Sequence, residues 1–407
     1  MKSYKELIPE FETAVKNGER INFPFIVHTY GQYLAGIKSD IYYNDPDTNI
    51  EISLLTAEYF GLSVGGGNGC WDLYNFEARA MGQTVQTAEF GLPDIDYNHP
   101  LCKTEEDLEK IKWEKDDPFE CGRLPLIVKG SELMEKYTGK PTTSVTCACS
   151  PFTLACEIFS FAGFMKIIKK KPDFAHQILD KIIYDIEIPL YKAIAKHYPG
   201  AICKCSDAWD MIPNISPKIE REYVWPSFDK IQEAVKDLDI KVGWWCTYGE
   251  SQMPDPDKYV EEKSKYNGAI SCMNREGMPG SFYRDNANRL GLRLMTWIPN
   301  EIVTSGPEEK IVEYIRNIAK TQRCGTDKFF WQAGVDPGTP LENAETALAA
   351  MKAFSVLPCP TPEEMDKIVV KPERHTESFG DFCRRHAKEN PNGYTFKWLD
   401  QARFIGE

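Results

Sequence analysis

Acidic and aromatic side chains follow a short apolar run near the middle of the chain. The run ends at Cys205, and Asp207, Trp209 and Asp210 come directly after it. A carboxyl group among tryptophan rings is poorly solvated, which raises its pKa and lets it hold a proton near neutral pH. Asp207 is therefore the first candidate for an acid that protonates a leaving oxygen. The alternative is that this aspartate caps a helix or a loop.

Thiols end three consecutive apolar runs in this half of the chain. They are Cys205, Cys246 and Cys272. Thiolates are good zinc ligands, so three of them at one end of a sheet could hold a metal ion. Free cysteines also pack as small apolar side chains, and this alternative explains the same pattern without a metal.

Other side chains that could act on a substrate stand near further apolar runs. His28 ends the first run and could donate a proton to a phenolate, and Asp72 follows a glycine-rich stretch as a third catalytic candidate. Arg275 could clamp a substrate carboxylate, although a surface pair with an acid explains it equally well. The remaining candidates are aromatic and would line a pocket for a flat ring: Tyr30, Trp71, Tyr74, Trp209, Trp244 and Trp245.

The apolar runs that carry these residues alternate with amphipathic helical stretches, which predicts an α/β fold with a parallel sheet. About eight runs favour a closed (β/α)8 barrel, or TIM barrel, in which the carboxyl ends of the strands carry the chemistry. The runs are Ile21–Val27, Gly61–Val64, Ser144–Cys147, Ala201–Cys205, Ile240–Cys246, Gly268–Cys272, Leu292–Trp297 and Lys328–Ala333.

The segments outside the runs complete the predicted architecture. Residues 1–20 should form an N-terminal helical extension, and residues 85–140 an irregular insertion over the barrel mouth with one short helix, Glu105–Lys112. Two long helices are expected over Phe152–Lys170 and Pro172–Tyr198. We expect residues 1–357 to form the barrel and residues 358–407, rich in proline and charge, to form a C-terminal extension packed on it.

The composition argues against several classes of function. The formal charge of -13 disfavours non-specific binding to nucleic acid or to an anionic membrane surface. No apolar run approaches the roughly 18 residues that span a bilayer, and no secretory signal is evident, so a cytoplasmic protein is expected. The 13 cysteines follow no secreted disulfide pattern, which favours reduced thiols and suits anaerobic metabolism.

Five sequence words occur in the order and spacing typical of the uroporphyrinogen decarboxylase superfamily. They are Pro24–Tyr33, Trp71–Gly82, Ser150–Leu154, Asp207–Asp210 and Gly334–Asn343. The chain therefore resembles that superfamily, which includes decarboxylases and corrinoid-dependent methyltransferases. The resemblance implies a TIM barrel over roughly residues 20–355.

Departures from the family patterns distinguish the two branches. The decarboxylase signature carries two arginines that bind the acid groups of the tetrapyrrole, and this chain has neither; His28 stands where the first is expected. The methyltransferase branch usually carries zinc on a His-x-Cys pair and a later Cys. Here Trp244 stands where the His is expected, Cys246 remains, and Ala333-Gly334 stands where the last Cys is expected. Whether zinc is bound stays open.

The resemblance thus implies a methyltransferase that moves a methyl group from a small methylated donor to the cobalamin of a separate corrinoid protein. The tryptophans favour a methoxylated aromatic donor, so that the reaction is an O-demethylation. The alternatives are a decarboxylase or lyase, which needs a cationic clamp such as Arg275 or Arg284, and a catalytically degenerate binding protein. A homodimer is one oligomeric state left open.

Overall fold

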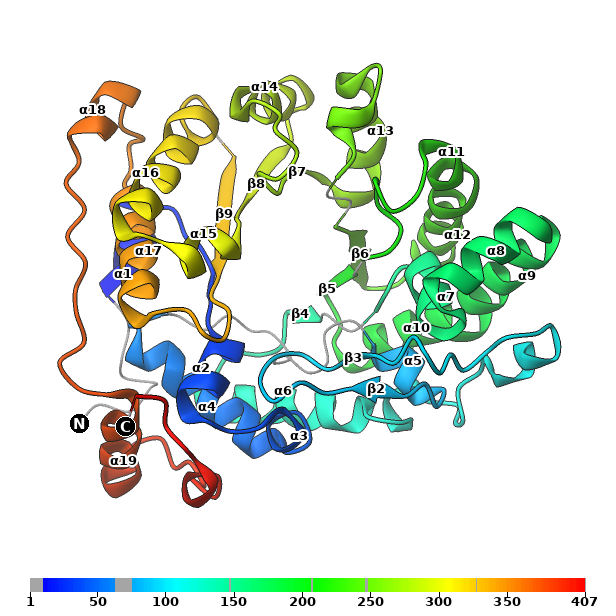
Figure 1. Cartoon of the computed structure of the whole chain (residues 1–407), viewed down its shortest axis with the longest axis horizontal. Helices are drawn as coiled ribbons and strands as arrows, with labels where there is room; N and C mark the ends of the chain where they lie inside the picture. The colour runs from blue at the N-terminus through cyan, green and yellow to red at the C-terminus, as the bar shows by residue number, and fades with distance from the viewer. Residues whose placement is uncertain are drawn as a thin grey trace. The chain divides into compact units, whose positions relative to one another are not determined.

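The computed structural model describes residues 10–62, 75–145, 148–205, 208–245, 248–326 and 328–406. They form two compact units. The first unit comprises residues 1–42, 48–64 and 247–407, and the second comprises residues 43–47 and 65–246. Each unit contains a parallel sheet with helices between its strands, so the predicted α/β class is confirmed (Figure 1).

The second unit is built on three parallel strands. In this sheet β5 (Ala201–Cys205) lies between β4 (Ser144–Val145) and β6 (Ile240–Trp244), and Cys205 is opposite Trp244 in the register. β5 has the predicted bounds, and β4 and β6 begin at the predicted residues. Cys147 and Cys246, where the other two predicted runs end, lie outside the described residues. The main helices of this sheet are α9 (Pro172–Lys181), the π-helix η3 (Ile182–Glu187), α10 (Ile188–His197) and α12 (Trp225–Val235).

One predicted helix, over Phe152–Lys170, is two helices. They are α7 (Pro151–Phe159) and α8 (Phe161–Lys170), which meet at Ser160 at an angle of 106°. Ser160 has φ of 61°, and its hydroxyl accepts a hydrogen bond from the backbone N–H of Gly163, so this residue starts a new helix. Among the described residues no single helix is long and apolar enough to cross a membrane; α7 and α8 meet those criteria only as this bent pair.

The insertion over residues 85–140 is more regular than predicted. A short antiparallel hairpin joins β2 (Val85–Gln86) to β3 (Asp94–Ile95), and η1 (Glu106–Lys110) occupies the place of the expected short helix. The prediction missed the 15-residue helix α6 (Leu124–Thr138). Its buried face includes Gly130 and Ser131 between the apolar residues, which weakens the apolar pattern in the sequence.

The first unit contains four parallel strands in the order β1, β9, β8, β7. Their bounds are Phe25–Ile26, Phe329–Gly334, Arg293–Ile298 and Ala269–Cys272. Helices precede or follow the three longer strands: α13 (Pro256–Asn267), α14 (Gly280–Leu290), α16 (Glu308–Ile318) and α17 (Leu341–Ala353). At the N-terminus, α1 (Glu10–Lys16) falls within the predicted helical extension.

A closed eight-stranded barrel is not observed among the described residues. Their parallel strands form one sheet of four and one of three. The predicted run that contains β1 yields a strand of only two residues, which offers few hydrogen bonds for pairing. The run over Ser144–Cys147 continues beyond β4 into residues that are not described. The run over Gly61–Val64 lies mostly outside the described residues, and Gly61 and Leu62 are not in a strand.

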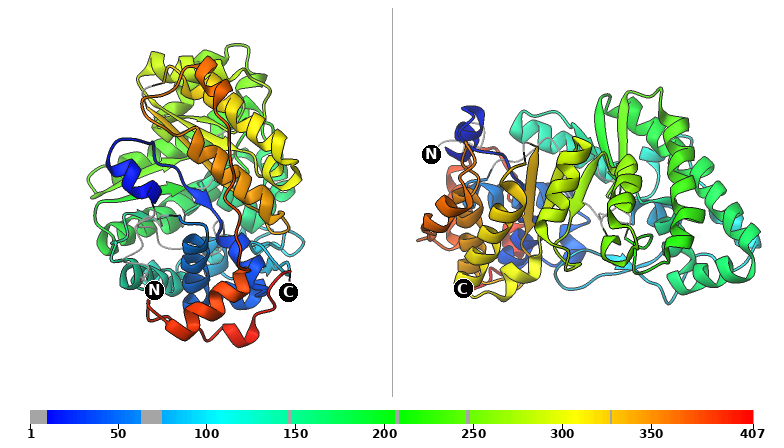
Figure 2. Two further views of the ribbon diagram at one scale, coloured as in Figure 1. Left: turned by 90° about the vertical axis from the view of Figure 1, so that its left-hand side faces the viewer. Right: turned by 90° about the horizontal axis from the view of Figure 1, so that it is seen from above.

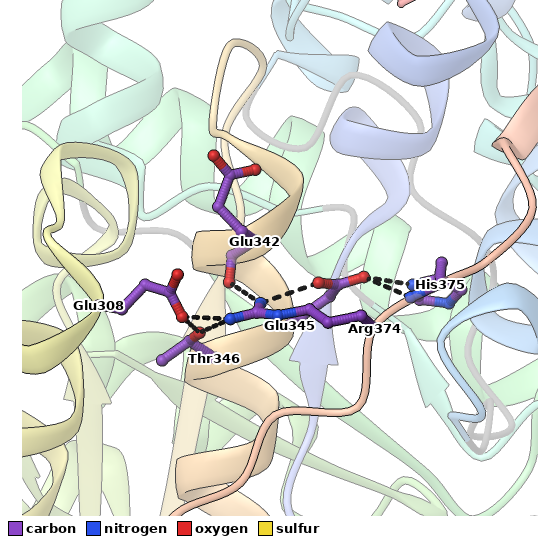
Figure 3. Close-up of polar contacts among 6 residues, drawn as sticks. All are labelled: Glu308, Glu342, Glu345, Thr346, Arg374 and His375. Carbon is purple, nitrogen blue, oxygen red and sulfur yellow. Dashed lines mark hydrogen bonds and ion pairs between the residues drawn. The ribbon is translucent and has the colours of Figure 1, made fainter.

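The residues after β9 and α17 return along the first unit as a segment that contains the short helix α18 (Pro362–Lys367), and we call it the C-terminal strap (residues 356–376). Figure 2 shows it running beside α16 and α17. Arg374 of the strap donates hydrogen bonds to the Glu342 carbonyl at 2.8 Å and to the Glu345 carboxylate at 2.9 Å. The His375 Nδ1 is 2.7 Å from the same carboxylate, as Figure 3 shows. The strap is therefore seated on α17 by charge-assisted hydrogen bonds.

Candidate functional site

A hydrogen-bonded row of polar side chains lies at the carboxyl ends of β7, β8 and β9. Asn274 donates to the carbonyl of Trp297 at 2.8 Å, and the Trp297 indole donates to Asn300 Oδ1 at 3.2 Å. Asn300 in turn donates to Asp336 Oδ1 at 2.8 Å. Asp336 is exposed and Trp297 is half-buried, so the row is open to a ligand. The sequence analysis recognised the word that contains Asp336 but did not select Asn300 or Asp336 as site residues.

Asn300 fills the space beside Gly334, which belongs to the pair Ala333-Gly334 that stands where the methyltransferase branch is expected to have its last cysteine. A Cβ atom at Gly334 would lie 2.9 Å from Asn300 Oδ1 and 3.1 Å from its Nδ2. Since the Asn300 amide is held between Trp297 and Asp336, it cannot move aside without losing those hydrogen bonds. The absence of the cysteine therefore goes together with a local packing in which Asn300 lies against Gly334.

Gly334→Ala should therefore lower the free energy of unfolding by about 1–3 kcal/mol, because the added methyl group overpacks the Asn300 contact. Urea unfolding measures the loss. Asn300→Ala in the same chain should remove most of the clash, so the double variant should be more stable than additivity of the two single substitutions predicts. Strict additivity would show that the contact is not rigid.

Three aromatic rings form a patch beyond the carboxyl end of β5 in the second unit. Trp209 stacks on Phe161 with ring centroids 5.0 Å apart at 26°, and meets Tyr97 edge-on at 5.5 Å. The Trp209 indole N–H donates to the Tyr97 hydroxyl at 3.0 Å, and its backbone N–H donates to Thr153 Oγ1 at 3.2 Å. All three rings are half-buried. This aromatic patch (Tyr97, Phe161 and Trp209) offers an ordered face to a flat ligand.

Two other predicted site residues of the second unit point into its helical layer. Trp244 is fully buried and stacks on Phe228 of α12 with centroids 4.1 Å apart. The Cys205 sulfur is 3.0 Å from the Tyr191 hydroxyl of α10, and burial raises the pKa of this thiol well above its usual range. Both contacts favour the packing alternative over a ligand-binding role. Trp245, the next residue in the chain, is half-buried.

The predicted residues of the first unit also make internal contacts. Tyr30 is fully buried, and its hydroxyl donates to the Thr339 carbonyl at 2.9 Å. Arg275 forms a 2.6 Å ion pair with Glu301, which is the surface pair considered as the alternative to a substrate clamp. Cys272 belongs to a hydrophobic cluster, and burial raises the pKa of its thiol to about 12.

A zinc site of the expected kind does not fit the described residues. Among them, no three His, Cys, Asp or Glu side chains are close enough to hold a metal ion together. Cys205 and Cys272 are each used in packing. Five predicted site residues lie outside the described residues: Trp71, Asp72, Tyr74, Asp207 and Cys246. His28 is the first residue of α2 (His28–Ala35), and its side chain is also outside the described part.

Three acidic side chains are buried together in the second unit. The sequence indicates Glu77 only as a companion of Asp72 that acts in catalysis or caps a helix, and it does not indicate Glu157 or Glu187. Glu77 of α5 (Phe76–Ala80) accepts a hydrogen bond from the backbone N–H of Cys149 at 2.8 Å. The Cys149 thiol lies 3.6 Å from the carboxylate of Glu157, and Glu187 lies in η3. Among the described residues none of these three carboxyl groups pairs with Lys or Arg. Burial raises the pKa of each, that of Glu77 to about 7.

This cluster predicts that stability falls as pH rises. Because the pKa of Glu77 is higher in the folded state than its usual 4.5, the folded chain binds more protons between about pH 4.5 and 7, and it loses stability across that window. Glu77→Gln keeps a hydrogen-bond acceptor for the backbone N–H of Cys149. It should reduce the loss of unfolding free energy with rising pH by up to about 3 kcal/mol. Urea unfolding at pH 5 and pH 8 tests this, with Glu132→Gln on the surface of α6 as the control. An equal pH dependence in wild type and Glu77→Gln would contradict it.

The first unit contains a buried ion pair, one member of which lies shortly after β6 in the chain. Glu250 in η5 (Glu250–Gln252) contacts Lys263 of α13, and both side chains are almost fully buried. Lys263 also donates to the Tyr248 carbonyl at 3.3 Å and lies over the ring of Tyr259. Burial raises the pKa of Glu250 to about 7, against the attraction of Lys263. Neither residue was selected from the sequence.

The parallel strands and the polar row at their carboxyl ends define an α/β protein of the kind that binds ligands at strand ends. A family model for uroporphyrinogen decarboxylase (URO-D) matches residues 24–354, and the chain belongs to this family. The membership predicted from the five sequence words is therefore confirmed.

Two relatives, one similar in sequence and one in structure, are named as methyltransferases. The methylated-thiol–coenzyme M methyltransferase of Methanosarcina mazei is 23% identical over 359 residues, which cover 85% of this chain and 86% of the relative. A solved methyltransferase from Methanosarcina mazei superposes with a TM-score of 0.61 at 19% identity, covering 87% of this chain and 99% of that chain. This superposition supports the fold.

Proposed function

We propose that the protein is a methyltransferase that moves a methyl group from a small methylated donor to the corrinoid of a partner protein in the cytoplasm. The observation that carries the proposal is the match over 85% of the chain to a methyltransferase. The loss of both signature arginines supports it, since a porphyrinogen decarboxylase needs fixed cations. Gln32, at the second arginine position, is buried and donates to the Ile37 carbonyl and the Ser39 hydroxyl.

A methoxylated aromatic is the donor that we propose. The aromatic patch of Tyr97, Phe161 and Trp209 would stack on its ring. The relative named above acts, by its name, on methylated thiols, so this donor class must be tested in parallel. When the methyl group leaves, the aryl oxygen takes up negative charge and needs a proton. Asp207 and His28 are the proposed donors of that proton.

The alternative lyase function requires a free cation at the strand ends. Of the two arginines considered for it, Arg275 is paired with Glu301, and Arg284 is paired with Asp285 and also donates to the Thr321 carbonyl. Such engaged side chains make a poor clamp for a substrate carboxylate. We therefore rank the lyase below the methyltransferase.

The test uses purified protein, free cob(I)alamin and a panel of methoxylated aromatics, methylated thiols and small carboxylic acids, all without oxygen. Methyl transfer appears as a change in the corrinoid absorbance, and decarboxylation as released CO₂. We expect transfer from a methoxylated aromatic, and a higher KM in Trp209→Ala than in Trp209→Phe. Transfer from methylated thiols alone would correct the donor. No reaction with any class, but binding of an aromatic, would favour the degenerate binding protein.

A further inference from the structure

Two cysteines of the first unit stand apart from the others. The sulfur atoms of Cys324 and Cys359 are 3.9 Å apart. Cys359 is exposed and Cys324 is half-buried, so a small reagent can reach the pair. The other described cysteines are all buried: Cys102, Cys121, Cys149, Cys156, Cys203, Cys205, Cys272 and Cys383.

The pair lies at the start of the C-terminal strap, where it runs along α16 and η6 (Ala319–Arg323). Arg316 donates to the Ile368 carbonyl at 3.1 Å, and Lys320 is 2.7 Å from Asp366. Arg323 contacts carbonyls of residues 354 and 356. The spacing of residues 316, 320 and 323 puts these side chains on one helical face, and Cys324 ends that row beside the strap.

We propose that Cys324 and Cys359 form a reversible disulfide that fixes the start of the strap to the end of η6. The distance of 3.9 Å must shorten to about 2.05 Å. Both thiols already lie on the same side of the strap, since each is within hydrogen-bond distance of the Pro360 carbonyl, at 3.1 Å for Cys324 and 3.5 Å for Cys359. Side-chain rotation at Cys359, which is in no helix or strand, can supply the movement.

The co-reactant is a low-molecular-weight disulfide. The Cys359 thiolate attacks one of its sulfurs, which breaks that S–S bond and releases one small thiol. The Cys324 thiolate then attacks the Cys359 sulfur and releases the second small thiol. The two cysteines lose two electrons and two protons, and the small disulfide gains them. Burial raises the pKa of Cys324 to about 11, so the exposed Cys359 is the better first nucleophile.

The consequence concerns the far end of the strap. Its residues from 369 to 375 form one wall of a cavity of about 750 Å³ whose other walls come from α1, α4 (Pro46–Tyr59) and α17. The strap is held there by Arg374 and His375, which bind Glu345 (Figure 3). A covalent bond at residue 359 would shorten the length of strap that can detach from these helices. This inference does not depend on the proposed methyl transfer.

The test is to incubate the reduced full-length protein with oxidised glutathione and digest it for mass spectrometry under non-reducing conditions. We expect a cross-linked peptide pair containing residues 324 and 359, two hydrogens lighter than the sum of the free peptides, and the loss of two titratable thiols. Cys324→Ser should instead accumulate a glutathione adduct at Cys359, and Cys383→Ala should behave as wild type. Cleavage of the oxidised strap by trypsin after Lys367 should be slower.

A glutathione adduct at Cys359 in the wild-type protein that never resolves to the internal cross-link would overturn the proposal. So would a disulfide between two chains through Cys359, seen as a dimer on a non-reducing gel. If the internal cross-link forms but trypsin cleaves the strap at an unchanged rate, the inferred restraint on the strap is wrong.

Discussion

Replacing Lys263 by methionine is expected to destabilise the protein by about 3–5 kcal/mol at pH 8. The ammonium group is the partner of Glu250, and both side chains are almost fully buried. Removing one member of such a pair leaves the other charge in an apolar environment without compensation. Methionine fills a similar volume, so the expected loss comes from the charge and from the hydrogen bond to the Tyr248 carbonyl.

The loss should depend on pH in a defined direction. The pKa of Glu250 is already raised by burial to about 7, and without Lys263 it rises further. Below its unfolded pKa of about 4.5 such an acid is protonated in both the folded and the unfolded chain, so it does not destabilise the fold. As pH increases toward the folded pKa, the unfolded chain loses the proton more readily, and the fold is destabilised. The difference between wild type and Lys263→Met should therefore be small near pH 5 and largest above pH 7.

Urea unfolding at pH 5 and pH 8 measures both effects. The double variant Glu250→Gln with Lys263→Met removes both charges and should recover most of the stability lost in the single variant. Lys258→Met, on the exposed face of the same helix, is the matched control for loss of a lysine and should change little. A single variant as stable as the double variant at pH 8 would show that Glu250 is not held in a low-dielectric environment.

The strands were predictable because each is a short, continuous apolar run bounded by polar residues. β5 has the predicted bounds, and β8 and β9 are each shifted by one residue. Closure of a barrel was not predictable in the same way. It depends on pairing between strands far apart in the chain, and a run such as the one containing β1 does not reveal that only two of its residues are in a strand.

The orientation of side chains at strand ends was harder to predict than the strands. Strands of a parallel sheet are apolar on both faces, so alternation does not tell which face is covered by helices. This is why Cys205 and Trp244 were candidates for the site although they face α10 and α12. The row from Trp297 to Asp336 depends on β8 and β9 being neighbours, which the chain order alone does not specify. A glutamate such as Glu77 is expected at the surface, so its burial carries no sequence signal.

Loss of the proton donor should have the largest effect on catalysis. In the proposed reaction the methyl acceptor is already a strong nucleophile, so the chain's own task is to stabilise the departing aryl oxygen. We expect Asp207→Asn or His28→Gln, whichever removes the donor, to lower kcat by roughly 10²–10⁴ with little change in KM. The corrinoid assay with a methoxylated aromatic measures both constants.

The chemical nature of the loss gives the sharper test. When the ring of the donor carries electron-withdrawing substituents, the phenolate leaves readily as an anion. Methyl transfer from such a donor depends less on a proton. The loss of kcat in the variant that lacks the proton donor should therefore be smaller with such a donor. A structural defect would lower kcat equally for all donors. The pH profile of kcat should also lose its fall at high pH in the variant, because that fall reports deprotonation of the acid. Full activity in both Asp207→Asn and His28→Gln, or stoichiometric zinc whose removal abolishes transfer, would assign the stabilisation of the leaving oxygen to another group.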